Sequence, residues 1–240
     1  MTATKVPEIK QRFLAAANQR IANDLQWFFK TGPGEYGEGD VFHGLKVPQT
    51  RAIAKEFKDL PINDLEKLLQ SQYHEERFCA VVILVERFKK SKTKDAKLEL
   101  FQQYLRFLDS GRVNNWDLVD VSAPYFGQAL LLDESLTDVM WELSRSETLW
   151  KQRAAVMFNY ALIREHELGP IFELVESLLA HPHDLMHKAC GWMLREAGKQ
   201  DLQALRLFLD QHVTGMPRTM LRYAIEKMSK AERTEWLSRK

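Results

Sequence analysis

The sequence predicts an all-α fold: a HEAT-like helical-repeat solenoid of stacked helix pairs that leaves a concave groove. Apolar residues recur at three- and four-residue spacing almost throughout, as at Ala80, Ile83, Leu84 and Phe88. Alternating strand patterns bounded by turns are missing. Similar helices also recur with a period of roughly 35–40 residues, which is typical of HEAT or armadillo repeats. The alternative is an ordinary helical domain whose helices resemble one another through composition.

The repeated helices share a basic residue followed by small and then large apolar residues. The pattern is found at 76–88, 150–162 and 186–197, and more weakly at 221–228. The basic positions are Arg77, Arg153, Lys188 and Arg222. The long interval after the first copy leaves room for one divergent copy around residues 117–126. In a solenoid the second helix of each pair lines the groove, so we expect its polar residues to be exposed for binding.

Helix boundaries are marked by a few breakers. Pro61 opens a helix, Pro124 lies in the first turns of another, and Pro217 follows Gly215. One long irregular segment, 31–47, interrupts the helices. With short connections elsewhere and no linker, we expect residues 1–240 to form a single domain.

Composition excludes an overall basic nucleic-acid binder. The 240 residues are 45% hydrophobic and carry 34 Lys and Arg against 33 Asp and Glu, a net charge of +1. If the protein binds nucleic acid, the fold must gather positive charge on one face. Neither a signal core nor an apolar run of about 18 residues is present, so no membrane segment is expected. Cys79 and Cys190 lie in apolar helical runs, which fits a reduced, cytoplasmic protein.

The first cluster that could carry chemistry is NNWDLVD, residues 114–120. Asp120 follows Trp116 by four residues, so a helix places both on one face. Asp117 stands at the helix start, where a carboxylate caps backbone N–H groups. Capping does not account for Asp120. From spacing alone, a salt bridge to an Arg of a neighbouring helix is the commoner role for such a carboxylate, and a catalytic role is the alternative.

Two further clusters carry basic residues. In LWKQRAAV, Arg153 stands among apolar residues and either pairs with Asp120 or binds a phosphate with its planar fork. In HKACGWMLREAGK, Lys188, Trp192 and Arg195 fall on one helix face, two cations around an indole, which suits nucleic acid. Gly191 beside Trp192 costs about 1 kcal/mol in a helix interior, and a close contact is one reason to tolerate it.

Cofactor and metal sites are not expected. The glycine-rich stretch 31–39 lacks the GK[ST] of a P-loop, which argues against nucleotide binding. The three histidines of HPHDLMH are better explained as a loop and helix start than as metal ligands. These histidines are His181, His183 and His187.

Four blocks in register resemble the AlkD-type family of DNA glycosylases. NWDLVD, LWKQRAAV and KACGWMLREAGK match its core blocks, and FHGLKVPQTR (42–51) matches an earlier F-x-G-x-x-x-P-x-x-R block. The resemblance runs from about residue 10 to residue 228. Two features depart from it: Asn115 replaces an aromatic residue, and the 31–40 segment is unlike the archetype and marks a subfamily.

The resemblance implies a monomeric enzyme that acts on double-stranded DNA containing alkylated bases. Asp120 would be its catalytic carboxylate, Trp116 and Trp192 would flank the lesion's deoxyribose, and Arg153 would hold the DNA backbone. We add the basic residues Arg51, Lys188 and Arg195 as phosphate contacts in the concave groove. The expected activity is release of cationic N3- or N7-alkylated purines in base excision repair, without metal or cofactor. The alternatives are a catalytically silent nucleic-acid-binding solenoid and a scaffold for protein partners.

Overall fold

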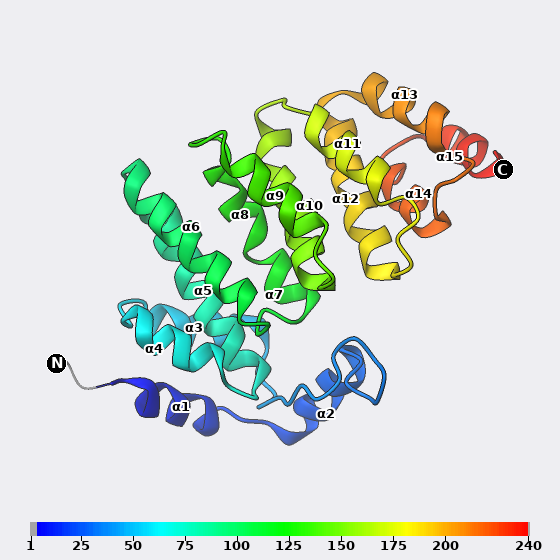
Figure 1. Ribbon diagram of the computed structural model, residues 1–240. Coiled ribbons are helices and arrows are strands. Elements are labelled where there is room, and N and C mark those ends of the chain that lie inside the picture. The colour runs from blue at the N-terminus through cyan, green and yellow to red at the C-terminus, as the bar shows by residue number, and fades with distance from the viewer. Residues whose placement is uncertain (1–3, 240) are drawn as a thin grey trace. The chain divides into compact units, whose positions relative to one another are not determined.

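The structure, a computed structural model, describes residues 4–239 and is built from helices (Figure 1). Within these residues no strand forms, and one isolated β-bridge joins Val41 to Tyr73. The all-α, helical-repeat prediction is confirmed. The chain folds into two compact units with the boundary after Ser122. The single domain over 1–240 therefore stays a prediction, and each unit is described by itself.

The first unit is organised around one buried helix. Its helices are α1 (Val6–Ala15), α2 (Gln19–Phe28), α3 (Val47–Glu56), α4 (Ile62–Leu69), α5 (His74–Lys90), α6 (Lys94–Asp109) and α7 (Trp116–Asp120). The helices α3, α4, α6 and α7 all contact α5. The middle of α5, from Phe78 to Val85, is apolar on every face and wholly buried. A helix that is hydrophobic all round needs neighbours on every side, and these supply them.

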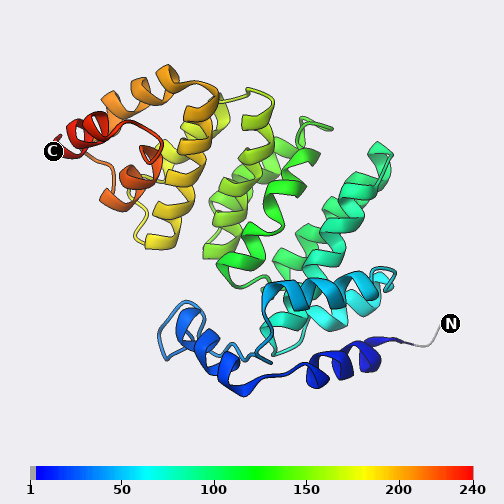
Figure 2. The same cartoon turned by 180° about the vertical axis from the view of Figure 1, so that it is seen from behind.

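The second unit repeats this arrangement around two long helices. Its elements are α8 (Ala123–Phe126), the 3₁₀ turn η1 (Gly127–Ala129), α9 (Leu136–Ser144), α10 (Leu149–Arg164), α11 (Gly169–Ser177), α12 (Asp184–Gln200), α13 (Leu202–His212), α14 (Arg218–Ala224) and α15 (Lys230–Ser238). The helices α8, α9, α11 and α12 contact α10, while α13 and α14 contact α12. Figure 2 shows α12 and α14 side by side.

The repeated helices form where the pattern predicts them, at α5, α10, α12 and α14. We expected the basic residues of these helices to be exposed, and two of the four are not. Arg77 and Arg153 are only 1% and 4% exposed, whereas Lys188 is half-buried and Arg222 is exposed. The expectation is wrong for the first two because their guanidinium groups donate hydrogen bonds to carbonyl groups inside their own units. A shared sequence position therefore does not give a shared environment.

The irregular segment ends where α3 begins, at Val47. Its last turn passes very close to the start of α2. Gly44 has φ +88°, and a Cβ there would lie 2.0 Å from the Asn18 carbonyl oxygen. The Asn18 amide donates to the His43 carbonyl oxygen at 2.9 Å, so the backbones of the two segments touch. Only glycine satisfies both the positive φ and the close approach.

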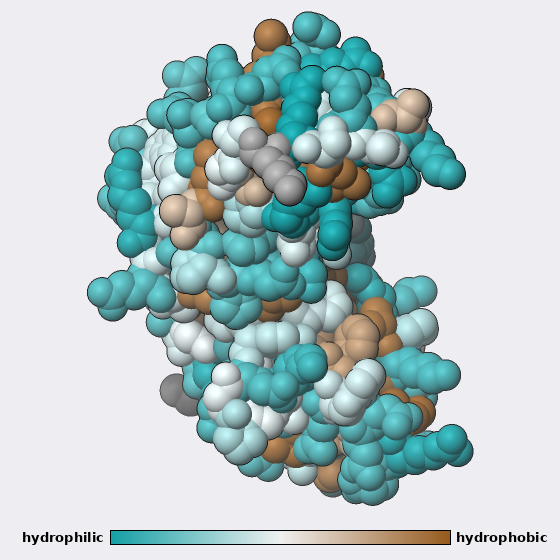
Figure 3. All heavy atoms as spheres, turned by 90° about the vertical axis from the view of Figure 1, so that its right-hand side faces the viewer, coloured by the Kyte–Doolittle hydropathy of each residue, from teal (hydrophilic) through white to brown (hydrophobic). Residues whose placement is uncertain are grey.

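On the face shown in Figure 3, charged and polar side chains dominate and apolar side chains form separate small patches. None of the helices within residues 4–239 combines the length and apolarity needed to cross a bilayer.

Gly191 explains how closely α12 and α14 pack, and it yields a stability prediction. A Cβ at Gly191 would lie 2.4 Å from the Met220 carbonyl oxygen and 2.6 Å from the Tyr223 Cβ. We expect Gly191→Ala to lower the free energy of unfolding by about 1–3 kcal/mol, because α14 must move to admit the methyl group. Urea unfolding followed by circular dichroism measures the change. Gly169→Ala is the matched control, since a Cβ there meets nothing within 4 Å. Equal stabilities of the two variants would contradict this account.

Candidate active site

The helix that carries Trp116 and Asp120 is very short. α7 has five residues, and its start is capped by Asn115, whose Oδ1 accepts from the Trp116 amide at 2.8 Å. The Asp117 Oδ1 accepts from the Leu118 amide at 2.9 Å. One turn of helix is not stable by itself, because nucleation fixes several residues for a single hydrogen bond. Tertiary contacts must therefore hold α7 in place.

Aromatic packing fixes one end of α7. The half-buried Trp116 ring stacks on Phe29, with ring centroids 5.4 Å apart, and meets Phe28 edge to face at 6.0 Å. Both partners lie at the end of α2. The neighbouring residue, Trp27, is 80% exposed. Phe28 and Phe29 thus hold the Trp116 ring in place, while part of the ring remains exposed to solvent.

Asp120 ends α7 and is half-buried. Nearby, the buried Tyr104 hydroxyl makes a 2.8 Å hydrogen bond with the Ser122 hydroxyl. Burial raises the pKa of Tyr104, and the negative charge of Asp120 raises it further. Tyr104 therefore stays neutral beside the carboxylate, and the tyrosine contributes no competing negative charge.

A buried ion network holds the other side of α7. His74, the first residue of α5, lies between two carboxylates. Its Nδ1 is 3.0 Å from Asp40 Oδ2, and its Nε2 is 2.8 Å from Asp117 Oδ2. The Arg77 guanidinium donates to Asp40 Oδ1 at 2.6 Å, and the Asn115 side-chain amide donates to Asp40 Oδ2 at 3.3 Å. Asp40 thereby connects the irregular segment to both α5 and α7.

The network sets the protonation of its members. Burial alone lowers the pKa of His74, but the charge of Asp117 and hydrogen bonds to Asp117 and Asp40 outweigh it and raise the pKa to about 9. Burial alone would raise the pKa of Asp40, yet the His74 hydrogen bond and the Arg77 charge hold it below its usual value. At neutral pH the group is therefore an imidazolium and a guanidinium facing two carboxylates.

A second set of contacts fixes the segment just before α3. The Glu75 carboxylate accepts from three consecutive backbone amides, those of His43, Gly44 and Leu45, at 2.8–3.1 Å. The His43 Nε2 lies 2.9 Å from Glu76 Oε1. Both carboxylates belong to the first turn of α5. The second half of the irregular segment, residues 40–45, is therefore anchored to α5, although it has no regular structure.

In the second unit, Arg153 is directed inward. Its Nη1 donates to the Leu185 carbonyl oxygen in the first turn of α12, so it braces α10 against α12. The Asp120 carboxylate, the partner that the sequence allowed besides a phosphate, stays a prediction. A phosphate contact by Arg153 stays a prediction, and it would have to use what little of the guanidinium is exposed.

The α12 residues lie on one side of their helix, as predicted, but carboxylates accompany them. The Trp192 Nε1 donates to Glu196 Oε1 at 3.1 Å. Lys188 pairs with Asp184 at 2.7 Å, while Arg195 pairs with Glu196 and Glu226. The positive charge of this surface is therefore largely balanced by neighbouring acids.

The histidines of the HPHDLMH stretch cap the start of α12. The His183 amide donates to His181 Nδ1 at 3.1 Å, and the Leu185 amide donates to His183 Nδ1 at 3.1 Å. The His187 ring contacts the His181 carbonyl oxygen. Across residues 4–239, no group of three His, Cys, Asp or Glu side chains is arranged to hold a metal ion.

The structure places several important residues that the sequence did not single out. Asp40 and His74 lie far apart in the chain and belong to no recognisable motif, although the unusual 31–40 segment contains Asp40. Trp27 lies on an amphipathic helix whose pattern does not distinguish an exposed indole from a buried one. Of the predicted residues, the first unit holds Trp116, Asp120 and Arg51, and the second holds Arg153, Lys188, Trp192 and Arg195.

Comparison with known proteins decides the family. The family model described as "DNA alkylation repair enzyme" matches residues 9–228. The chain belongs to the DNA alkylation repair enzyme family. Its fold is similar to that of a solved protein entitled "Predicted DNA alkylation repair enzyme from Enterococcus faecalis", with a TM-score of 0.70 and 18% identity over 89% of this chain and 97% of that one. Among curated proteins, none matches this sequence. The family match therefore confirms the resemblance that the four sequence blocks indicated.

The His74 network predicts a pH dependence of stability. The folded pKa of about 9 lies above the ordinary value of 6.5, so the network's contribution is complete below pH 6.5 and is lost as pH rises through 9. We expect wild type to lose up to about 3 kcal/mol between these pH values relative to His74→Asn. Denaturant unfolding at several pH values measures the difference.

The control for this experiment is His166→Asn. His166 is exposed and has φ +63°, a conformation that Asn tolerates. Its pH profile should follow wild type. Parallel profiles for wild type and His74→Asn would show that the imidazolium is not stabilised by its carboxylates.

Proposed function

We propose that this member of the family is a DNA glycosylase that hydrolyses the N-glycosidic bond of cationic N3- or N7-alkylated purines in duplex DNA. Asp120 is the proposed catalytic carboxylate, and Trp116 and Trp192 are the proposed aromatic partners of the sugar. The observation that carries the proposal is α7 itself. Its two ends present a half-exposed indole and a half-exposed carboxylate, and buried contacts fix its first turn.

The chemistry suits a site with one carboxylate. An N3- or N7-alkylated purine is already a cation, so it departs neutral without a proton donor. Ordinary glycosidases need two carboxylates because one of them protonates the leaving oxygen. Asp120 would stabilise the oxocarbenium-like sugar electrostatically and orient the attacking water. That water adds to C1′ and releases a proton to solvent as the C1′–N bond breaks.

Preorganisation is the main demand of this mechanism. A carboxylate stabilises developing positive charge best when it does not have to move during the reaction. α7 meets this demand because the His74–Asp117 contact and the Phe29–Trp116 stack hold it at two points. The indole face of Trp116 would add a cation–π contribution to the same charge. Because the alkylated base need not enter a pocket, the proposal does not require base flipping.

The proposed phosphate contacts are Arg51, Lys188 and Arg195, together with Arg153. Arg51 is exposed, and Lys188 and Arg195 are partly exposed. A silent DNA-binding protein would use the same cations without the carboxylate, so the decisive experiment measures base release as well as binding. A scaffold for proteins would need a large apolar patch. The face shown in Figure 3 has only separate small ones.

Asp120→Asn should abolish base excision while DNA binding survives. The substitution keeps size and hydrogen bonding but removes the negative charge opposite the sugar cation. We expect single-turnover release of 7-methylguanine or 3-methyladenine from methylated duplex DNA to slow by about 10²–10³, which corresponds to roughly 3–4 kcal/mol. Binding should hold or tighten slightly, because a carboxylate repels phosphates.

The matched control is Asp95→Asn, which removes an exposed carboxylate from the first turn of α6 in the same unit. It should excise bases at the wild-type rate. Comparable rates for wild type and Asp120→Asn would overturn the catalytic assignment. A thermal melt accompanies the assay, since an Asp120→Asn protein that unfolds would show instead that the carboxylate has a structural role.

A further inference from the structure

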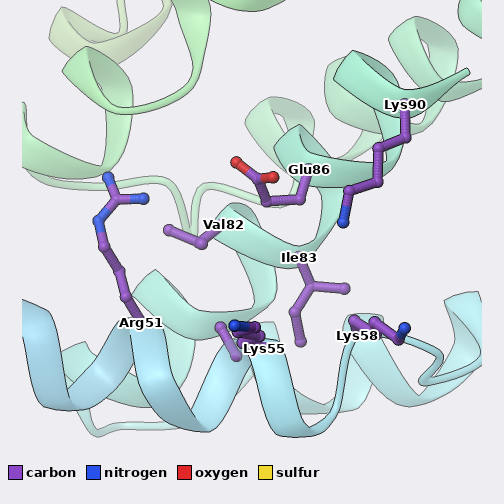
Figure 4. Close-up of a pocket in the computed structure, with 8 residues that line it drawn as sticks. Arg51, Lys55, Lys58, Val82, Ile83, Glu86 and Lys90 are labelled. Carbon is purple, nitrogen blue, oxygen red and sulfur yellow. The ribbon is translucent and has the colours of Figure 1, made fainter.

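A basic groove lies between α3 and α5, apart from α7. It has a volume of about 260 Å³, with a floor of apolar side chains that include Ala54, Val82 and Ile83. Figure 4 shows Arg51 at one end, Lys90 at the other, and Glu86 between them. The remaining lining residues are Lys55 and Lys58. Four cations therefore surround one carboxylate.

These cations are not neutralised in the way that those of α12 are. Glu86 forms its ion pair with Lys89, at 2.8 Å, outside the groove lining. In the part of the chain that the structure describes, no carboxylate forms an ion pair with the four cations of the groove. The chain has a net charge of only +1. The groove therefore carries an excess of positive charge, in which Glu86 is the one carboxylate of the lining and interacts electrostatically with Lys90 and Arg51.

The cations are spaced along a line and do not converge on a point. Arg51, Lys55 and Lys58 are four and three residues apart, which places them along one side of α3 and its C-terminal end over roughly 10 Å. A second depression shares Lys58, Lys90 and Glu86 with the groove and adds Arg87 and Asp59. A single small anion would engage only part of this row. An extended polyanion could engage all of it.

Neighbouring contacts hold the row in position. The Arg51 guanidinium lies over the Phe78 ring, 5.8 Å from its centroid. Arg87 donates to the carbonyl oxygens of Lys58 and Leu60, which fixes the backbone where α3 ends. The stems of the lysines lie against an apolar floor, so their ammonium groups extend toward solvent.

We infer that this α3–α5 groove is the principal phosphate-binding surface of the first unit and takes the backbone of one strand of duplex DNA. The inference rests on the proposed function and deepens it, because it assigns backbone binding to Lys55, Lys58 and Lys90 in addition to Arg51. Phosphates in one strand follow one another every 3.4 Å along the duplex axis, so a row of about 10 Å spans several of them.

The salt dependence of binding tests the inference. Undamaged duplex DNA is the probe, and its dissociation constant is measured between about 50 and 200 mM salt. Each phosphate contact contributes about 0.9 to the log–log slope, so Lys55→Gln/Lys58→Gln/Lys90→Gln should reduce the slope by about 2–3. Lys227→Gln/Lys230→Gln/Arg233→Gln makes the same charge change around α15 and should leave the slope unchanged.

Glu86→Gln provides a second test with the opposite sign. It removes the negative charge from the groove and should tighten binding at low salt. If the groove residues only kept α3 packed on α5, the triple Lys→Gln variant and Glu86→Gln would not change the affinity for DNA in opposite directions. If the triple groove variant keeps the wild-type slope, or if Glu86→Gln weakens binding while its thermal melt is unchanged, the groove does not bind the backbone.

Excision assays separate this inference from the proposed function. At saturating enzyme the groove variant should release methylated bases at the wild-type maximal rate, but it should need more enzyme to reach that rate. If wild type binds DNA through the groove but releases no base, the glycosylase proposal is wrong, while the inference that the groove binds the DNA backbone is supported. If wild type releases bases and the groove variant binds as tightly as wild type at every salt concentration, the groove inference alone fails.

Discussion

The first unit depends most on the ion pairs of the buried Asp40 carboxylate. A charge taken out of water is costly unless it is paired and hydrogen-bonded, and Asp40 is paired with both Arg77 and His74. These three groups come from the irregular segment and from α5. Loss of the Asp40 carboxylate would leave the buried Arg77 guanidinium without its ion-pair partner and His74 with Asp117 alone, so the segment cannot detach without leaving buried charge unpaired. An irregular stretch of chain is thereby made a fixed part of the structure.

The same network reaches the proposed catalytic helix through one more contact. His74 bonds to Asp117, which is flanked by Trp116 and lies in the first turn of α7. α7 is too short to hold its own geometry. Its orientation is therefore set by a histidine on α5 and by aromatic rings on α2. The repeats supply a scaffold of packed helices, while the precision of the site comes from contacts that the repeats do not contain.

The sequence predicts the fold well because the signal is local and repeated. Helical periodicity places α5, α10 and α12 correctly, and a glycine inside a helix, Gly191, points to a close contact, which α14 makes. The environments of Arg77 and Arg153 are not predictable in this way. At the helix position of both residues, a side chain can be either exposed to solvent or covered by protein. Which of the two occurs depends on how a neighbouring segment packs against the helix. The Asp40–His74 contact joins residues 34 positions apart with no periodic relation, so no local pattern could reveal it.

Charge in this protein is used in two separate ways, which explains how a chain with net charge +1 can belong to a family of DNA repair enzymes. Inside the first unit, Arg77 and His74 are matched by carboxylates and serve rigidity. On α12, Lys188 and Arg195 are also matched, so they add little long-range attraction for a polyanion. We infer that this attraction comes in part from the cations of the α3–α5 groove, which form no ion pair with a carboxylate of the described residues. Because ion pairs cancel charge only locally, bulk composition hides this division. The position of each carboxylate therefore matters more for DNA binding than the total number of basic residues.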